Sequence, residues 1–269
     1  MYYLIDYHIH TSISPDGKDS IMQVCESAIN KGLKEIAITE HCEMHRKDWA
    51  SKYYDLGKYK NEILEVRENF KGKIEIRAGL ELGQPYRNLK ESEELIGSFN
   101  YDYIIGSLHK MINNIDLGKL DLTTITLDNL CVEYLQQLDQ MVVCGKFDCL
   151  GHLDLIKRYS TDYYKQRITL IKYYDFLVDI LKKIIKNGKG IEINTSGLRQ
   201  APKETMPGLD VIKLYKSLGG EIITVGSDSH NKNDVGKNII DALKLCEEVG
   251  FKYITTFNNR KPYWKKIYE

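Results

Sequence analysis

The feature that most constrains the fold is a strand–helix alternation that repeats about seven times along the chain. Short runs rich in β-branched residues, such as Glu35–Thr39 and Gly190–Asn194, are each followed by a longer segment with helical periodicity. This alternation is typical of parallel βαβ units, because each helix returns the chain to the start of the next strand. The expected strands are Tyr3–His8, Glu35–Thr39, Ile74–Leu80, Tyr103–Leu108, Phe147–His152, Gly190–Asn194 and Glu221–Gly226.

The segments between these strands carry apolar residues at helical spacing. In Asp162–Lys186, the longest of them, Leu177, Leu181 and Ile184 share one helical face, and Asn187-Gly188 supplies a stop signal. The expected helices are Ser20–Lys31, Tyr59–Phe70, Asn88–Ile96, Leu127–Cys144, Asp162–Lys186, Gly208–Ser217 and Val235–Val249.

Either an open doubly wound sheet or a closed barrel accommodates such an alternation. No glycine-rich phosphate loop opens a helix after the first strand, which removes the best argument for a Rossmann sheet. The chain has 269 residues, of which 42% are hydrophobic, and it contains no evident linker or repeat. We therefore expect one α/β domain over residues 1–269.

The composition argues against binding to nucleic acids or membranes. Lys plus Arg and Asp plus Glu number 38 each, so the chain lacks the positive field that such surfaces require. No run of 18 apolar residues indicates a membrane span, and Asp6, His8 and His10 interrupt the place of a signal peptide. The six cysteines form no Cys-x-x-Cys pair, which favours reduced thiols and a cytoplasmic location. No pattern indicates an oligomeric state.

Six of the seven histidines fall at or just after the carboxyl end of an expected strand. Glu81 takes the equivalent place after the third strand, and Asp228 lies two residues before the last of these histidines. The carboxyl ends of barrel strands open onto one face, so these side chains should meet around one pocket. The six histidines are His8, His10, His41, His109, His152 and His230.

The spacing and chemistry of these residues indicate a metal site. His8 and His10 stand two apart on an extended segment, which points both side chains the same way, and Asp228 and His230 repeat that geometry. Imidazole and carboxylate together suit zinc, manganese or iron, whereas calcium prefers oxygen ligands. His45 lies further into its loop, and we expect it to remain outside the site.

Six short motifs carry a resemblance to a known family. The motifs span residues 6 to 230. Because they occur in the order typical of the polymerase-and-histidinol-phosphatase (PHP) family, the chain resembles that family. Its size and spacing look most like the stand-alone histidinol-phosphate phosphatases of histidine biosynthesis. The motifs are Asp6–Thr11 (DYHIHT), Ile38–His41 (ITEH), Gly79–Glu81 (GLE), Gly106–His109 (GSLH), Gly151–Asp154 (GHLD) and Gly226–His230 (GSDSH).

The resemblance implies a distorted (β/α)7 barrel with its active site at the carboxyl ends of the strands and two to three divalent metal ions. Where the family often has Asp before the histidine that follows strand two, this chain has Glu40, which is not expected to be a ligand. The implied ligands are His8, His10, Glu81 and Asp228 for the first ion, Glu81, His109 and His152 for the second, and Asp16, His41 and His230 for the third.

The reaction that this implies is hydrolysis of a small-molecule phosphate ester, L-histidinol phosphate, by water that the metals activate. Asp228 would orient the attacking water, and His230 or His41 would protonate the leaving group if its metal is absent. No motif presents a nucleophile for a phospho-enzyme, so a single displacement is expected.

Three cations are candidates for binding the phosphate. Arg158 follows the fifth-strand motif, Arg199 lies in the loop after strand six, and Lys110 follows His109. Arginine suits phosphate because its guanidinium donates two parallel hydrogen bonds. Asp154 is expected either to orient a ligand imidazole or to cap the following helix.

Two alternatives stay open. The same site would serve a phosphatase acting on phosphotyrosine or on nucleotides, although the zero net charge argues against oligonucleotides. A protein of another class, a non-catalytic barrel that binds a metal or a ligand, would be expected to have lost some of these residues.

Overall fold

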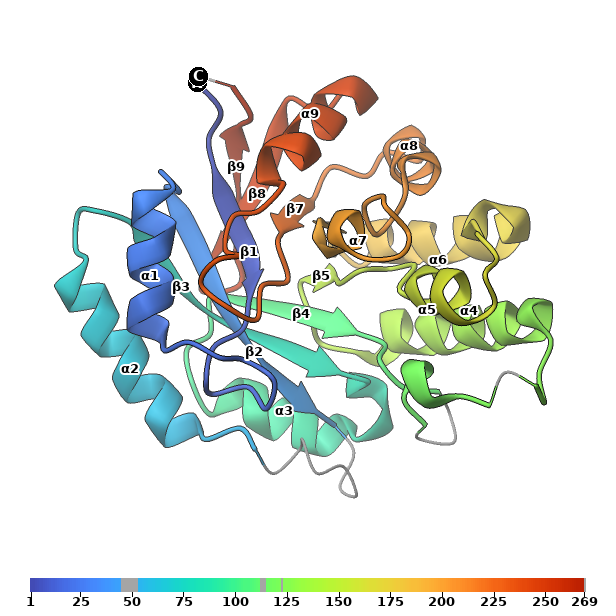
Figure 1. Ribbon diagram of the computed structural model, residues 1–269, viewed down its shortest axis with the longest axis horizontal. Coiled ribbons are helices and arrows are strands. Elements are labelled where there is room, and N and C mark those ends of the chain that lie inside the picture. Colours follow the sequence, from blue (N-terminus) through green and yellow to red (C-terminus); the bar gives the residue numbers. More distant parts are fainter. Residues whose placement is uncertain (45–52, 112–114, 122, 269) are drawn as a thin grey trace.

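A computed structural model describes residues 1–44, 53–111, 115–121 and 123–268. Seven parallel strands pair in sequence order, and the expectation of a (β/α)7 barrel is confirmed (Figure 1). An isolated parallel bridge between Ile9 and Ser229 brings the last strand back to the first. The strands are β1 (Ile5–Ile9), β2 (Glu35–Glu43), β3 (Glu75–Gly83), β4 (Tyr103–Ser107), β5 (Cys149–Leu150), β6 (Gly190–Asn194) and β7 (Ile223–Gly226).

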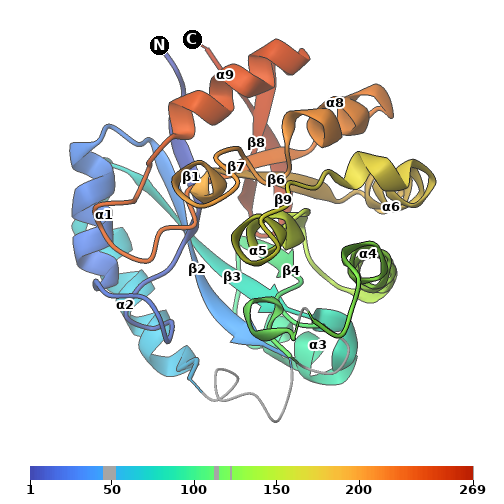
Figure 2. The ribbon, with the colours of Figure 1, turned by 45° about the vertical axis from the view of Figure 1, so that its right-hand side comes forward.

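Most of the helices surround these strands on the outside of the barrel (Figure 2). Several begin at residues with a side chain that caps the first turn: Ser20 and Gln23 form a capping box at α1, and Thr126 accepts from the Asn129 amide at α4. The α-helices are α1 (Ile21–Asn30), α2 (Leu56–Asn69), α3 (Leu89–Gly97), α4 (Leu127–Cys144), α5 (Ile156–Tyr163), α6 (Tyr174–Lys186), α7 (Ser196–Arg199), α8 (Leu209–Ser217) and α9 (Ile239–Val249). Short 3-10 turns are η2 (Pro85–Arg87), η3 (Leu117–Lys119) and η4 (Leu170–Tyr173).

One predicted helix, Asp162–Lys186, is wrong as a single element. The structure divides it into the end of α5, the turn η4 and α6, with residues 164–169 outside any helix. Lys165 has a φ of 53°, which interrupts the helical backbone. Thr169 then accepts a hydrogen bond from the Ile171 amide and starts a new turn.

An antiparallel hairpin of β8 (Tyr253–Asn258) and β9 (Lys261–Lys266), which the sequence analysis did not predict, follows the barrel. It packs against the amino-terminal ends of the barrel strands, where the Phe257 amide donates to Tyr7 Oη and Arg260 pairs with Asp148. Since this end of the barrel is occupied by the hairpin, the site must be sought at the opposite end.

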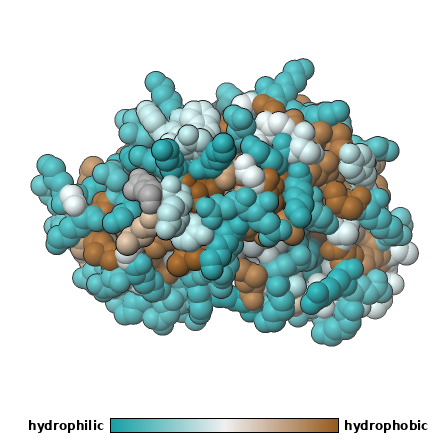
Figure 3. Space-filling view, turned by 90° about the horizontal axis from the view of Figure 1, so that it is seen from above, coloured by the Kyte–Doolittle hydropathy of each residue, from teal (hydrophilic) through white to brown (hydrophobic). Residues whose placement is uncertain are grey.

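Most side chains on the face seen in Figure 3 are hydrophilic, with smaller hydrophobic patches between them. Among the residues that the structure describes, no helix is long and apolar enough to cross a membrane.

Asp6 ties the first strand to the segment that follows the last one. Its buried carboxylate accepts hydrogen bonds from the Ser227 amide (2.8 Å), the Ser227 hydroxyl (2.5 Å) and the Gly236 amide (2.7 Å). The Ser227 donors are fully buried, so they would have no water to replace the carboxylate if it were removed.

We expect Asp6→Ala to lower the free energy of unfolding of the metal-free protein by about 2–4 kcal/mol, because several buried donors lose their acceptor. Chemical denaturation monitored by circular dichroism measures this loss. Asp128→Ala is the control: Asp128 pairs with Lys172 on the surface, and its loss should cost less than about 1 kcal/mol. Equal denaturation midpoints for the two variants would contradict the role given to Asp6.

Candidate metal centre

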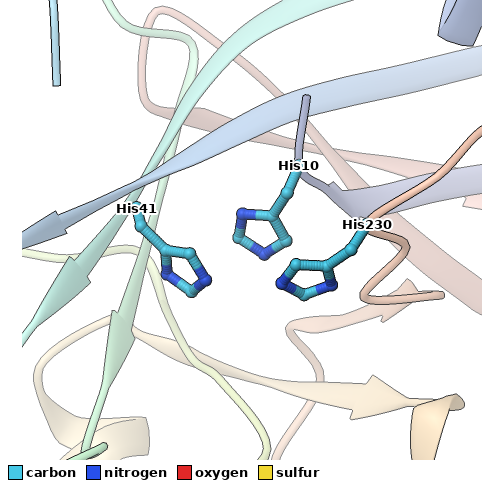
Figure 4. A group of neighbouring side chains, drawn as sticks. All are labelled: His10, His41 and His230. Carbon is cyan, nitrogen blue, oxygen red and sulfur yellow. The ribbon is translucent and has the colours of Figure 1, made fainter. Parts of the chain in front are cut away.

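The carboxyl ends of the strands bring together residues that are more than 200 positions apart in the sequence. His10 directly follows β1, His41 lies in β2, and His230 follows β7, and Figure 4 shows their three imidazoles gathered in one place. The ring centroids of His41 and His230 lie 4.0 and 4.3 Å from that of His10, so His10 stacks against both.

Glu81, in β3, is the carboxylate at the centre of this cluster. It is fully buried, and its Oε1 lies 3.1–3.3 Å from the Nε2 atoms of His8, His109 and His152. Oε2 of Glu81 lies 2.7 Å from Nδ1 of His41. His41 stands directly opposite Glu81 in the pairing of β2 with β3. The strand register therefore explains why these two side chains meet.

Asp228 faces the other side of the histidine cluster. Its Oδ1 lies 3.5 Å from Nε2 of His10 and 3.8 Å from Nε2 of His8. Asp16 approaches from the rim, with Oδ2 3.2 Å from Nε2 of His230 and 3.7 Å from Nε2 of His41. Asp228 is almost completely buried, whereas Asp16 is more than half exposed.

The distances and the unpaired atoms fit divalent metal ions. Two ligands that each lie about 2.1 Å from one ion, at angles between tetrahedral and octahedral, are roughly 3.0–3.4 Å apart. Within the part of the chain that the structure describes, Nε2 of His8, Nε2 of His10 and Oε2 of Glu81 are buried and have no hydrogen-bond partner. Buried polar atoms are costly without a partner, and a bound cation would satisfy all three.

Groups of donor atoms close enough to share one ion can be picked out of this cluster. Triads whose donor atoms all lie within 4.8 Å of one another are His8, His10 and Asp228; His8, Glu81 and His152; His10, His41 and His230; and His41, Glu43 and His109. These triads overlap with the predicted ligand sets, but none of them reproduces a predicted set in full.

The local electrostatics keep His10 and the carboxylates in the forms that bind metals, whereas neighbouring carboxylates outweigh burial and raise the pKa values of His8 and His109. Burial, with a contribution from His41 and His230, holds the pKa of His10 well below its ordinary value, which leaves its imidazole neutral. Burial alone would raise the pKa of Asp228, but His8 and other cationic neighbours outweigh burial and hold this pKa well below its ordinary value. The carboxyl of Glu81 is kept ionised in the same way.

Two supporting carboxylates were not predicted from the sequence. Glu192 lies 2.6 Å from Nδ1 of His8, and Glu43 lies 2.7 Å from Nδ1 of His109. Both are buried, Glu43 at the end of β2 and Glu192 in the middle of β6. An acidic residue at a buried strand position was the signal in the sequence that would have identified Glu192.

Glu40 points away from the histidine cluster. It accepts hydrogen bonds from the amide and hydroxyl of Thr11 and from the hydroxyl of Ser14, and Ser14 Oγ in turn accepts from the His41 amide. Glu40 therefore holds the loop that leads to Asp16. His45, which was expected to remain outside the site, lies outside the described residues.

A cavity of about 550 Å³ opens above the cluster, a size suited to a small ligand. Polar and charged side chains of both signs form much of its wall. The residues that line it include Asp16, His41, Glu43, His109, Lys110, Asp116, Lys119, His152, Arg158, Tyr159, Asp228 and His230.

Two of the three predicted phosphate-binding cations line this cavity. Arg158 lies 3.4 Å from Asp228 Oδ2, and Lys110 stands beside His109 at the wall. Arg199 is directed elsewhere: its guanidinium donates to the backbone carbonyl of Ser227 at 2.6 Å, and it is not among the lining residues described.

Asp154 has a structural role. It pairs with the buried ammonium of Lys157 at 2.8 Å and accepts from the Gly208 amide at 3.0 Å. It therefore joins the start of α5 to the loop before α8. Neither role expected for Asp154 is seen: no contact among the described residues joins it to a ligand imidazole, and α5 begins at the cap residue Leu155 without a side-chain hydrogen bond.

The barrel and its cluster define the class to which the protein belongs, a (β/α)7 barrel with a histidine–carboxylate metal centre at the carboxyl ends of its strands. Comparison with known proteins identifies the family. A model described as the PHP domain matches residues 6–196, and the histidinol-phosphatase of Lactococcus lactis is 31% identical over 266 residues, covering 96% of this chain and 95% of that protein. The chain belongs to the PHP family.

Other relatives agree with this assignment. The histidinol-phosphatase of Bacillus subtilis is 27% identical, with 90% of this chain and 98% of that protein covered. A crystal structure of histidinol phosphate phosphatase from L. lactis, complexed with zinc, L-histidinol and phosphate, superposes with a TM-score of 0.87 at 30% identity. That match covers 97% of this chain and 99% of the other.

Proposed function

We propose that this protein is a metal-dependent phosphomonoesterase that hydrolyses L-histidinol phosphate to L-histidinol and phosphate. The observation that carries the proposal is the likeness, over 97% of the chain, to a phosphatase complexed with zinc, L-histidinol and phosphate. It is supported by the cavity directly above the histidine–carboxylate cluster. A non-catalytic barrel would be expected to have lost some of these ligands.

We assign two to three divalent ions to the cluster, with zinc as the first candidate and manganese or iron as alternatives. Such ions lower the pKa of coordinated water to roughly 7 and offset the negative charge that develops on the phosphoryl oxygens. The ligand sets follow the family pattern: His8, His10, Glu81 and Asp228; Glu81, His109 and His152; and Asp16, His41 and His230.

The chain's own residues would hold and orient the reactants. Arg158 and Lys110, on the cavity wall, supply cationic donors for phosphate oxygens. Asp228 reaches the same space between Arg158 and the buried histidines, where its carboxylate would orient the attacking water. His230 or His41, at the rim, would protonate the leaving alkoxide when the third position holds no metal.

The leaving group of L-histidinol phosphate is an amino alcohol that carries an ammonium group and an imidazole. Asp116, which lines the cavity, offers a carboxylate that complements an ammonium group, and Tyr159 offers an aromatic face. We assign leaving-group recognition to this side of the cavity. A cytoplasmic location agrees with six cysteines that are all free thiols.

Replacing Arg158 with methionine should raise KM for L-histidinol phosphate at least tenfold, or about 1.4 kcal/mol, because the phosphate loses a charge-assisted donor. Metal content should stay unchanged, since Arg158 is not among the assigned ligands. Arg199→Met is the matched control, because the guanidinium of Arg199 bonds to a backbone carbonyl and should leave KM within about threefold. Steady-state phosphate release measures both variants, and equal KM values would remove Arg158 from the phosphate site.

A substrate panel tests the proposed function. Zinc-loaded protein is assayed with L-histidinol phosphate, phosphotyrosine, nucleoside monophosphates and a generic aryl phosphate. The proposal predicts that kcat/KM is at least a hundredfold higher for L-histidinol phosphate, about 2.7 kcal/mol of discrimination. Similar kcat/KM values for all compounds would exclude L-histidinol phosphate as the preferred substrate but would still support a phosphatase. No phosphate release from any compound would favour the non-catalytic barrel.

A further inference from the structure

We propose that Glu192 is a positioning residue that couples the two buried metal positions, by supporting one ligand of each from behind. This inference rests on the proposed metal centre and adds to it a residue that contacts neither metal nor substrate. Glu192 lies in β6 and is 1% exposed. Its two carboxylate oxygens contact two different ligand residues, His8 and His152.

The first contact fixes the ring of His8. Oε1 of Glu192 lies 2.6 Å from Nδ1 of His8, which donates its proton to the carboxylate. This bond leaves the lone pair on Nε2, the atom that faces Glu81 at 3.3 Å and Asp228 at 3.8 Å. A carboxylate behind a ligand imidazole selects the tautomer, restricts the ring and makes it a stronger ligand.

The second contact fixes the backbone of His152. Oε2 of Glu192 accepts a hydrogen bond of 2.9 Å from the His152 amide. His152 has a φ of 20°, a conformation that residues other than glycine rarely adopt and that the surroundings must maintain. The hydrogen bond to Glu192 is part of what maintains it.

His152 depends on this backbone contact because its ring lacks the usual support. Its Nε2 faces Glu81 Oε1 at 3.1 Å, while its Nδ1 is buried with no hydrogen-bond partner among the described residues. Within the described ranges, no carboxylate or carbonyl orients the ring through that nitrogen. The direction of the ligand atom therefore follows from the backbone that Glu192 holds.

Close packing leaves Glu192 little freedom to move. A Cβ added to Gly226, on the neighbouring strand, would stand 2.5 Å from Oε1 of Glu192 and 2.4 Å from Cβ of His8. A glycine at this position lets the carboxylate and the imidazole lie side by side. Asn194 also donates to Oε2 at 3.3 Å, which fixes the second oxygen further.

Glu43 provides the comparison. It is buried, and its Oε1 lies 2.7 Å from Nδ1 of His109. Its other oxygen accepts from the side-chain amide of Gln84, and no hydrogen bond among the described residues joins it to the backbone of a second ligand. In the assigned scheme Glu43 therefore supports the second metal alone, whereas Glu192 supports the first through His8 and the second through His152.

The test is a zinc-binding isotherm of the full-length protein, measured by competition with a chromophoric chelator. Wild type, Glu192→Gln, Glu192→Ala and Glu43→Gln are compared, and thermal unfolding of each metal-free variant confirms that it is folded. Removing an outer partner of a metal ligand typically weakens binding 10- to 100-fold. We expect both tight binding steps to weaken at least tenfold in the two Glu192 variants, and one step alone to weaken in Glu43→Gln.

Weakening of one step or of neither in Glu192→Gln would overturn the coupling. That result would leave the metal-dependent hydrolase intact, because the wild type would still bind zinc and release phosphate. If Glu192→Ala does not fold, Glu192→Gln carries the test, since glutamine keeps the volume of the side chain. A wild-type protein that binds no zinc would instead reject the metal centre on which the inference rests.

Discussion

Replacing Glu81 with glutamine should lower kcat/KM for L-histidinol phosphate by about 10⁴-fold, roughly 5.5 kcal/mol of transition-state stabilisation. Glu81 is fully buried and faces the ligand nitrogens of His8, His109 and His152 within 3.3 Å. In the assigned scheme it bridges two ions, and a neutral amide with one oxygen cannot serve both. The zinc content of the variant, measured by elemental analysis, should fall together with its activity.

The fold should survive this change. Glutamine has the volume of glutamate and keeps one oxygen that can accept the hydrogen bond from the Ser107 hydroxyl. Glu35→Gln is the control. Glu35, in β2, is buried like Glu81, but it lies at the other end of the barrel, where it pairs with Arg77. That variant should bind zinc normally even if it is less stable. Activity of Glu81→Gln within tenfold of wild type would contradict the bridging role.

Replacing Asp228 with asparagine should lower kcat by at least about 10³-fold, or roughly 4 kcal/mol. Asp228 has a φ of 52°, a backbone conformation that asparagine tolerates as well as aspartate does, so the loop should keep its shape. The substitution removes the negative charge that faces the Nε2 atoms of His8 and His10. Phosphate release at saturating substrate, divided by bound zinc, measures the loss in the chemical step.

Ser229→Ala is the neighbouring control for this variant. The Ser229 hydroxyl is buried and has no hydrogen-bond partner among the described residues, so its removal should change kcat less than threefold. A near-normal kcat per bound metal in Asp228→Asn would exclude the carboxylate from orienting the attacking water.

Most of the barrel was predictable because its strands are short buried runs separated by helices with clear periodicity. The hairpin β8–β9 was not, since its second strand, Lys261–Lys266, is largely exposed and begins with a lysine and Pro262. Its turn residues Asn259 and Arg260 both have positive φ, but their sequence is not the Asn-Gly typical of such turns. Without apolar alternation or a turn signal, nothing in the sequence indicated a hairpin.

The candidate ligands were predictable for a topological reason: the carboxyl ends of parallel strands meet at one face. Glu192 and Glu43 were missed because each hydrogen-bonds to a histidine that follows another strand, a contact that spacing in the sequence does not reveal. Arg199 shows the opposite error. Its position in the loop after β6 suggested that its side chain enters the pocket. It lies instead at the end of the short helix α7, and its guanidinium donates to a backbone carbonyl. Side-chain direction in a loop is set by such local contacts, which spacing alone does not reveal.

The most direct test of the metal-dependent phosphatase is a titration of metal-free protein with zinc while phosphate release from L-histidinol phosphate is recorded. The account predicts negligible release without metal and a rate that rises with bound zinc until at least two ions per chain are held. Equal rates in metal-free and zinc-loaded protein, or no release at full occupancy, would contradict it.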